Sequence, residues 1–137
     1  PGLRVRTVEP VGFDDVARSL DAGERLANPH LSGSICDAIL TPAPGELTFP
    51  ILRRRVGPGL TVSDDEALSA MRLAFEHLRI VLEPGGAVSL AAAIARADSI
   101  AGDAVIVVAT GGNVDGALFA RTVVGEAKTV RACPELR

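Results

Sequence analysis

The stretch "VIVVATGGNVDGALF", residues 105–119, constrains the fold more than any other part of the chain. A run of valine, isoleucine and alanine ends abruptly in Thr-Gly-Gly-Asn, and a pattern typical of a helix follows. Short apolar runs of this kind are typical of strands that are buried on both faces of a parallel sheet. We therefore predict a buried strand over 103–110, a tight turn, and a helix over 114–125.

The turn itself is a candidate ligand site. Ligands of parallel sheets bind beyond the carboxyl ends of the strands, and Thr110 lies at such an end. The glycines leave room for a flat ring or a phosphate, the next helix offers free N–H groups, and Thr110 offers a hydroxyl. A strand-to-helix turn without a ligand is the alternative, because neither the GxGxxG pattern nor the Walker lysine pattern is present.

Strand and helix patterns alternate in the rest of the chain. Apolar residues on one face, a capping box of Ser63 and Glu66, and a stop at Pro84 predict a long helix over 64–83. The other expected elements are strands over 3–9 and 60–62, and helices over 13–23, 46–57 (interrupted at Pro50) and 87–102. This order implies an α/β fold with a parallel sheet and crossover helices.

Two acidic features are further candidates for chemistry. Glu83 lies at the expected end of an apolar helix, where the helix dipole disfavours negative charge; a surface glutamate at a helix stop is the alternative. Glu9, Asp14 and Asp15 form a small acidic group whose oxygens suit Mg²⁺ or Ca²⁺. Simple acidity at a helix start is the alternative for this group.

Composition argues against several classes of function. The net charge is −3 and no basic stripe extends beyond Arg53-Arg54-Arg55, so we expect no nucleic-acid partner. No apolar run is long enough to span a bilayer, and the N-terminus has no signal-peptide pattern, so we expect no membrane association. The two cysteines lack CxxC spacing, which indicates reduced thiols and a cytoplasmic location.

Hydrolase and zinc chemistry also lack support. His30 and His77 show no metal-ligand spacing, and the serines near Cys36 lack the context of a nucleophile elbow.

Four stretches, in this order, resemble the C-terminal part of the catalytic domain of the serine/threonine dehydratase family, which includes threonine ammonia-lyase and serine racemase. They are "VEPVGFDDVARSL", "ICDAILTPAPGELTFPI", "TVSDDEALSAMRLAFEHLRIVLEPGGAVSLAA" and "VIVVATGGNVD". The resemblance implies the tryptophan synthase β-like (type II) fold of enzymes that depend on pyridoxal 5′-phosphate. Residues 1–124 would be the later half of its large domain, and residues 125–137 a polar tail.

The resemblance also implies site residues. Thr110, followed by Gly111, matches the position whose hydroxyl hydrogen-bonds the pyridine nitrogen of the cofactor, and Glu83 matches a glutamate near the ring. Ala38 stands in a segment that passes near the ring, where many relatives have glycine. In metal-activated members a divalent cation, Mg²⁺ or Ca²⁺, would bind the positions of Glu9, the Phe13 carbonyl and Asp15.

The activity implied by the resemblance is that of an L-threonine/L-serine ammonia-lyase, which eliminates water and releases a 2-oxo acid and ammonia. A racemase or a hydroxyaspartate dehydratase is a further possibility within the enzyme class. Neither the Schiff-base lysine nor the phosphate loop of the family is matched, and the one lysine, Lys128, lies in the tail.

We therefore expect this chain to be inactive alone and to belong with an N-terminal half, in an enzyme that forms a homodimer and acts on a small amino acid. The alternative function is a non-catalytic module for cation or ligand binding, or for assembly.

Overall fold

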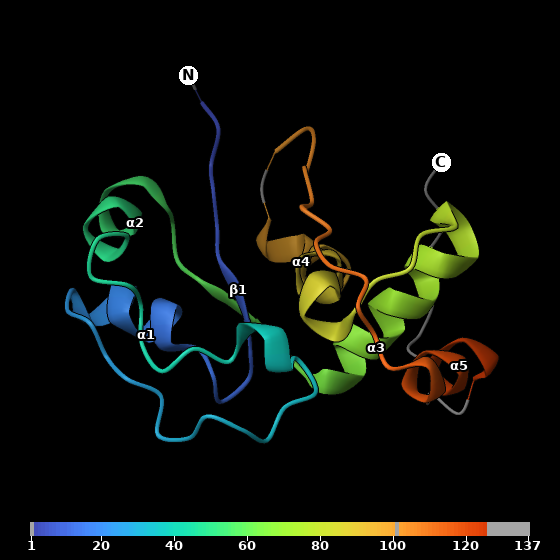
Figure 1. The fold of residues 1–137 in the computed structure, drawn as a ribbon. Coiled ribbons are helices and arrows are strands. Elements are labelled where there is room, and N and C mark those ends of the chain that lie inside the picture. Colours follow the sequence, from blue (N-terminus) through green and yellow to red (C-terminus); the bar gives the residue numbers. More distant parts are fainter. Residues whose placement is uncertain (1, 101, 126–137) are drawn as a thin grey trace.

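The computed structural model describes residues 2–100 and 102–125. Its elements, in chain order, are β1 (Val8–Pro10), α1 (Asp15–Ala22), the 3₁₀ turn η1 (Asp37–Ile39), α2 (Phe49–Arg55), β2 (Leu60–Val62), α3 (Asp64–Leu73), the π-helical turn η2 (Ala74–Leu78), α4 (Pro84–Ala95), the 3₁₀ turn η3 (Ala97–Ser99) and α5 (Gly116–Val124). In Figure 1, α1 and α2 lie on one side of β1, and α3, α4 and α5 lie on the other. The predicted tail, except for Gly125, lies outside the described residues.

The two strands pair in parallel, with Val8 opposite Leu60 and Pro10 opposite Val62. Both α1 and α2 belong to the crossover between the strands, so the predicted parallel sheet with crossover helices is confirmed. The strand predicted over 3–9 is shorter than expected, and only an isolated parallel bridge between Val5 and Val56 precedes β1. In α2, Pro50 stands in the first turn and does not interrupt the helix, because that position requires no N–H group.

The capping box that predicts the start of α3 is present. The Ser63 hydroxyl accepts from the backbone N–H of Glu66 at 3.2 Å, and the Glu66 carboxylate accepts from the Ser63 N–H at 2.8 Å. Arg96 adds two hydrogen bonds to the same carboxylate, at 2.6 and 3.1 Å. These contacts join the end of α4 to the beginning of α3.

The predicted end of this helix is wrong. The helix closes in the π-helical turn η2, Arg79 adopts a left-handed backbone with φ of 59°, and no helix follows until Pro84. Pro84 is the first residue of α4 rather than a stop, since a fixed φ and a missing N–H suit the first turn of a helix. As a result Leu78 is 61% exposed, although the pattern predicts it on the buried face.

Small side chains allow α3 and α4 to pack closely. The buried positions that face each other are almost all alanine, with one methionine and one valine: Ala67, Ala70, Met71, Ala74, Ala87, Val88, Ala91 and Ala92. The helix α5 packs on α3, and its Phe119 makes an edge-to-face contact with Phe75 of η2, with ring centroids 5.3 Å apart. No helix among residues 2–100 and 102–125 is long and apolar enough to cross a membrane.

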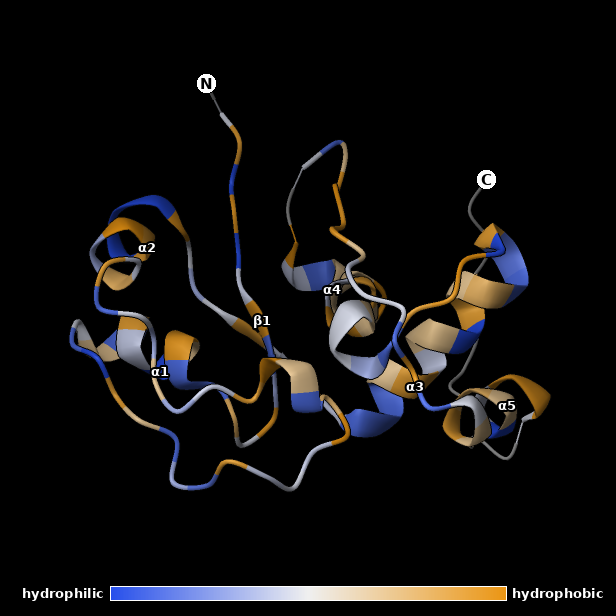
Figure 2. Ribbon diagram, viewed as in Figure 1, coloured by the Kyte–Doolittle hydropathy of each residue, from blue (hydrophilic) through white to orange (hydrophobic). Residues whose placement is uncertain are grey.

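The strand predicted over 103–110 is the main disagreement with the sequence pattern. The segment forms no strand, and Val105, Ile106 and Val108 are 52%, 82% and 65% exposed. Figure 2 shows this hydrophobic segment running along the outside of the described fold. An apolar run predicts extended backbone, but a buried strand also needs neighbours on both sides, and the described residues supply none. The helix after the turn is confirmed as α5, with the Asp115 side chain capping it.

Candidate functional site

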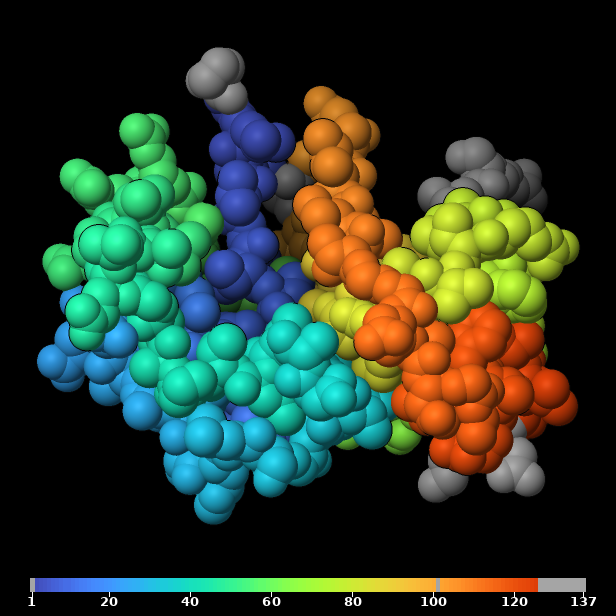
Figure 3. Space-filling model, in the orientation of Figure 1, coloured from blue at the N-terminus to red at the C-terminus, as the bar shows by residue number. Residues whose placement is uncertain are grey.

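Three segments that are distant in sequence meet at the N-terminus of α4. They are η1, the Glu-Pro-Gly-Gly stretch over 83–86 and the Thr-Gly-Gly-Asn turn over 110–113. Figure 3 shows the same neighbourhood, where the teal, yellow and orange parts of the surface adjoin. The structure thus brings together all four residues that the resemblance places around a cofactor: Ala38, Glu83, Thr110 and Gly111.

Glu83 connects α4 to the turn through both its backbone and its side chain. Its N–H donates to the Gly111 carbonyl at 3.2 Å, and its carboxylate Oε2 accepts from the Asn113 N–H at 3.1 Å. A third contact runs from the Thr110 N–H to the Gly86 carbonyl at 3.4 Å. The predicted place of Glu83 at the negative end of a helix is wrong, because it is the N-cap residue of α4, where the helix dipole favours a carboxylate.

Two glycines make this approach possible. A side chain at Gly86 would overlap the Thr110 carbonyl, and a side chain at Gly111 would overlap the Glu83 carboxylate. Gly111 also adopts a φ of +69°, a conformation that L-residues rarely take. The glycines therefore permit the close approach of protein backbone and the Glu83 side chain, in addition to any ligand.

The Thr110 hydroxyl is free to meet a ligand. Thr110 is exposed, and among the described residues none donates to this hydroxyl or accepts from it, although the backbone on both sides is held. A hydroxyl can donate one hydrogen bond and accept two, so it suits a ring nitrogen.

Ala38 reaches the same place from η1. A side chain at Gly85 would contact the Ala38 Cβ at 3.7 Å and Ile39 at 3.5 Å, so η1 packs directly over the first turn of α4. Ala38 is exposed and Ile39 is partly buried against the core. Ala38 thus lies beside the first turn of α4 and keeps an exposed side.

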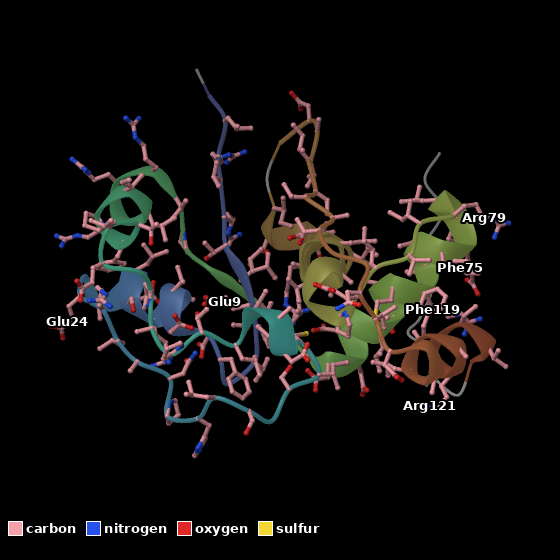
Figure 4. The ribbon with its side chains drawn as sticks, viewed as in Figure 1. Glu9, Glu24, Phe75, Arg79, Phe119 and Arg121 are labelled. Atoms are coloured by element: carbon pink, nitrogen blue, oxygen red, sulfur yellow. The ribbon has the colours of Figure 1, made fainter. Side chains whose placement is uncertain are left out.

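The acidic group predicted to hold a cation is already hydrogen-bonded within the protein. The two oxygens of the Glu9 side chain accept from the N–H groups of Val16 and Ala17 at 2.9 and 2.8 Å, so this residue of β1 reaches the start of α1 (Figure 4). Asp15 is fully buried and accepts from Asn28 Nδ2 at 2.6 Å.

Burial raises the pKa of Glu9 above its ordinary 4.5 and the pKa of Asp15 above its ordinary 3.8. The hydrogen bonds that these carboxylates accept act in the opposite direction and lower both pKa values, but burial outweighs them. Asp14 pairs with Arg18 at 3.2 Å, and its charge adds to the rise in the pKa of Glu9.

No group of three or more histidine, cysteine, aspartate and glutamate side chains within the described ranges is arranged for a metal. The predicted set has only two such side chains, Glu9 and Asp15, together with the carbonyl of buried Phe13. The cation site stays a prediction.

The sequence reasoning did not assign roles to Gly85, Gly86 and Asn113. Both glycine pairs were visible as motifs, but nothing in the sequence indicates that one motif packs against the other across an interval of about 30 residues.

Comparison with known proteins agrees with this architecture. The model of the family described as "Pyridoxal-phosphate dependent enzyme" matches residues 1–111. The chain is 40% identical to the beta-hydroxyaspartate dehydratase of Paracoccus denitrificans (strain Pd 1222), over 84% of this chain and 36% of that protein. It is 37% identical to the serine racemase of Dictyostelium discoideum, with the same two coverages.

A solved structure, that of the T.th. threonine deaminase, superposes with a TM-score of 0.77 at 40% identity, over 82% of this chain and 37% of that one. The chain spans little more than a third of the length of the curated relatives it matches. It belongs to the family of pyridoxal-phosphate dependent enzymes, and its α/β fold is that of the tryptophan synthase β-like members.

Proposed function

We propose that the protein containing this chain is a pyridoxal-phosphate dependent ammonia-lyase that acts on L-serine or L-threonine. Residues 1–124 are its partial cofactor-binding domain, with Ala38, Glu83, Thr110 and Gly111 on the side of the pyridine ring. The observation that carries the proposal is the exposed Thr110 hydroxyl, which has no partner among the described residues and stands on a turn whose backbone is bonded to α4. The cofactor, when bound, supplies an electron sink for charge that develops at the substrate Cα.

A hydroxyl at this position favours elimination. Thr110 is uncharged and can hydrogen-bond a ring nitrogen without giving it a proton, whereas a carboxylate would favour a protonated ring. With a weaker electron sink, removal of the α-proton is best coupled to loss of the β-hydroxyl. The water lost in the elimination is taken up again when the resulting imine hydrolyses, so the net products would be ammonia and a 2-oxo acid.

The test uses the full-length protein loaded with pyridoxal phosphate. We expect L-serine or L-threonine to yield a 2-oxo acid and ammonia, and we expect Thr110→Ala to lower kcat/KM about tenfold or more by removing one hydrogen bond. Thr110→Ser keeps the hydroxyl and is the matched control. Formation of D-serine without 2-oxo acid would favour a racemase instead, and unchanged kcat/KM in Thr110→Ala would contradict the proposal.

The non-catalytic module is the second candidate, and the observation that favours it is the single lysine, Lys128, which lies outside the four matched stretches and the described residues. Borohydride reduction of the native gene product with pyridoxal phosphate distinguishes the two. A species heavier than 14.1 kDa that carries one reduced cofactor supports the enzyme, in which an N-terminal half supplies the lysine and the phosphate site. A 14.1 kDa species without an adduct supports the module.

Two further proposals concern partners. The first is that the intact enzyme is a homodimer in the cytoplasm. Analytical ultracentrifugation would test the oligomeric state, and cell fractionation would test the location.

The second is that a Mg²⁺ or Ca²⁺ ion binds Glu9, the Phe13 carbonyl and Asp15, as in metal-activated members. Because the Glu9 oxygens already accept two N–H groups, we expect only a modest rise in Tm with either ion, and none in Asp15→Asn.

A further inference from the structure

The carboxylate of Glu83 lies against the turn over 110–113. Its Oε2 accepts from the Asn113 N–H, and the rest of the carboxylate occupies the volume that a side chain at residue 111 would need. As an N-cap residue it could accept from its own helix, yet it makes no such hydrogen bond. The side chain is thus committed to the turn over 110–113.

The turn is held at three points on the two sides of Thr110. The N–H of Thr110 donates to Gly86, the carbonyl of Gly111 accepts from the Glu83 N–H, and the Asn113 N–H donates to the Glu83 carboxylate. We call these three contacts the Glu83 clamp. Of the three, only the last depends on a side chain, so only the last can be removed by substitution without altering the backbone.

The clamp holds the backbone from which the Thr110 side chain projects. A turn that contains a left-handed glycine has several accessible backbone conformations, and fixing the backbone in one of them has an entropic cost. The two backbone contacts lie at 3.2 and 3.4 Å, at the long end of hydrogen bonds. The Glu83 side-chain contact, at 3.1 Å, is only slightly shorter, but its acceptor is a carboxylate, so we expect it to contribute the most of the three.

We propose that Glu83 is a positioning residue, which orients the Thr110 hydroxyl through the backbone of the turn and makes no contact of its own with the ring. This inference rests on the proposed function only for the identity of the ligand. It replaces the expected direct contact between Glu83 and the ring with an indirect one, because the Glu83 carboxylate already accepts from the Asn113 N–H.

The first experiment needs no cofactor. Amide hydrogen exchange is measured on the cofactor-free full-length protein, in the wild type and in Glu83→Ala, Glu83→Gln and Asp115→Ala. We expect exchange at Asn113 to be about tenfold faster in Glu83→Ala and nearly unchanged in Glu83→Gln, whose amide oxygen still accepts. Asp115→Ala is the matched control. The Asp115 carboxylate accepts from the Leu118 N–H at 2.8 Å, so its loss should affect only the start of α5. Unchanged exchange at Asn113 in Glu83→Ala would overturn the inference.

The second experiment separates this inference from the proposed function. The absorption spectrum and the apparent Kd of pyridoxal phosphate are measured in the same variants and in Thr110→Ala. We expect Glu83→Ala to shift both in the direction of Thr110→Ala, and Glu83→Gln to restore them. If Thr110→Ala changes the spectrum and Glu83→Ala does not, the positioning role is wrong and the proposed function stands. If Thr110→Ala leaves the spectrum unchanged, the proposed contact with the ring fails, whatever the exchange shows.

Discussion

The chain contains two Glu-Pro pairs, Glu9-Pro10 and Glu83-Pro84, and both glutamates accept hydrogen bonds from backbone N–H groups. Glu9 is buried and bonds to Val16 and Ala17, only seven and eight residues away. Glu83 is half-buried and bonds across 30 residues to Asn113. The same dipeptide thus closes a local strand-to-helix connection in one region and joins two distant segments in the other.

The two glutamates therefore have different roles in the fold. Glu9 satisfies two N–H groups at the start of α1, groups that every helix leaves without a partner inside itself. Its loss should weaken the fold and leave the turn over 110–113 in place. Glu83 satisfies one N–H group in a turn whose other contacts are weak, so its loss should disturb the site more than the fold.

The largest expected effect concerns Gly86, which follows the Glu83-Pro84 pair. Gly86→Ala places a methyl group on the Thr110 carbonyl, which is backbone and cannot move aside alone, so we expect a loss of about 2–3 kcal/mol in the free energy of unfolding. Gly116→Ala is the control, since a Cβ added at this position would meet no atom within 4 Å. Its effect should be neutral or slightly stabilising, because alanine is a better helix former. Equal effects in urea denaturation would mean that the two segments do not touch.

Gly12 and Gly111 allow the contact with Glu83 to be separated from backbone strain, because both glycines have positive φ, of 83° and 69°. Gly12→Ala meets no atom within 4 Å, so we expect only backbone strain of about 1 kcal/mol. Gly111→Ala must also displace the Glu83 carboxylate from Asn113, so we expect about 2 kcal/mol in total. In Glu83→Ala the extra cost at Gly111 should disappear, and a double-mutant cycle by urea denaturation would measure it.

Glu9→Ala and Glu83→Ala compare the two carboxylates directly. We expect losses of about 2 and about 1 kcal/mol in the free energy of unfolding, since Glu9 accepts two hydrogen bonds in a buried place and Glu83 accepts one in a half-exposed place. The reverse order would show that the long-range contact is the stronger. The Glu→Gln variants, which keep an acceptor oxygen, are the controls for each position.

The smallest effect is on the pH dependence of stability. Burial raises the pKa of Glu9 above 4.5 and of Asp15 above 3.8, so the folded chain binds these protons more tightly than the unfolded chain. The free energy of unfolding should therefore gain a contribution as pH falls from 7 through the raised pKa values toward 4.5 and 3.8. Glu9→Gln and Asp15→Asn should each remove their own part of this gain.

Glu66 acts in the opposite direction. Burial tends to raise its pKa, but hydrogen bonds from Arg96 and Ser63 outweigh burial and hold it below 4.5. Its contribution is present above 4.5 and is lost as pH falls through the lowered value. Urea denaturation at several pH values between 7 and 3, with Glu66→Gln as a third variant, would separate the groups. A Glu9→Gln profile parallel to that of the wild type would contradict the assignment of Glu9.

Local chemistry made much of the fold predictable. The capping box of Ser63 and Glu66, the strand at Leu60–Val62 and the left-handed glycine that ends α1 all follow from residues within one or two turns of each other. Local reasoning failed at Pro84, where a proline between two apolar stretches is equally compatible with a stop and with a start. The helix dipole argument for Glu83 was wrong for the same reason, because it depended on which helix the residue belongs to.

Periodicity and neighbouring residues along the chain are enough to predict the parallel α/β order, the helix start at Ser63 and the residues of both glycine motifs. Three features could be seen only in the folded chain: the two motifs face each other, Glu83 accepts from Asn113, and Glu9 accepts from the first N–H groups of α1. The folded chain also shows that the apolar run over 103–110 forms no strand among the described residues. The physical reason is the same in each case, since hydrogen bonds between distant segments and the pairing of a strand depend on which groups lie nearby in space, and that is a property of the packed chain.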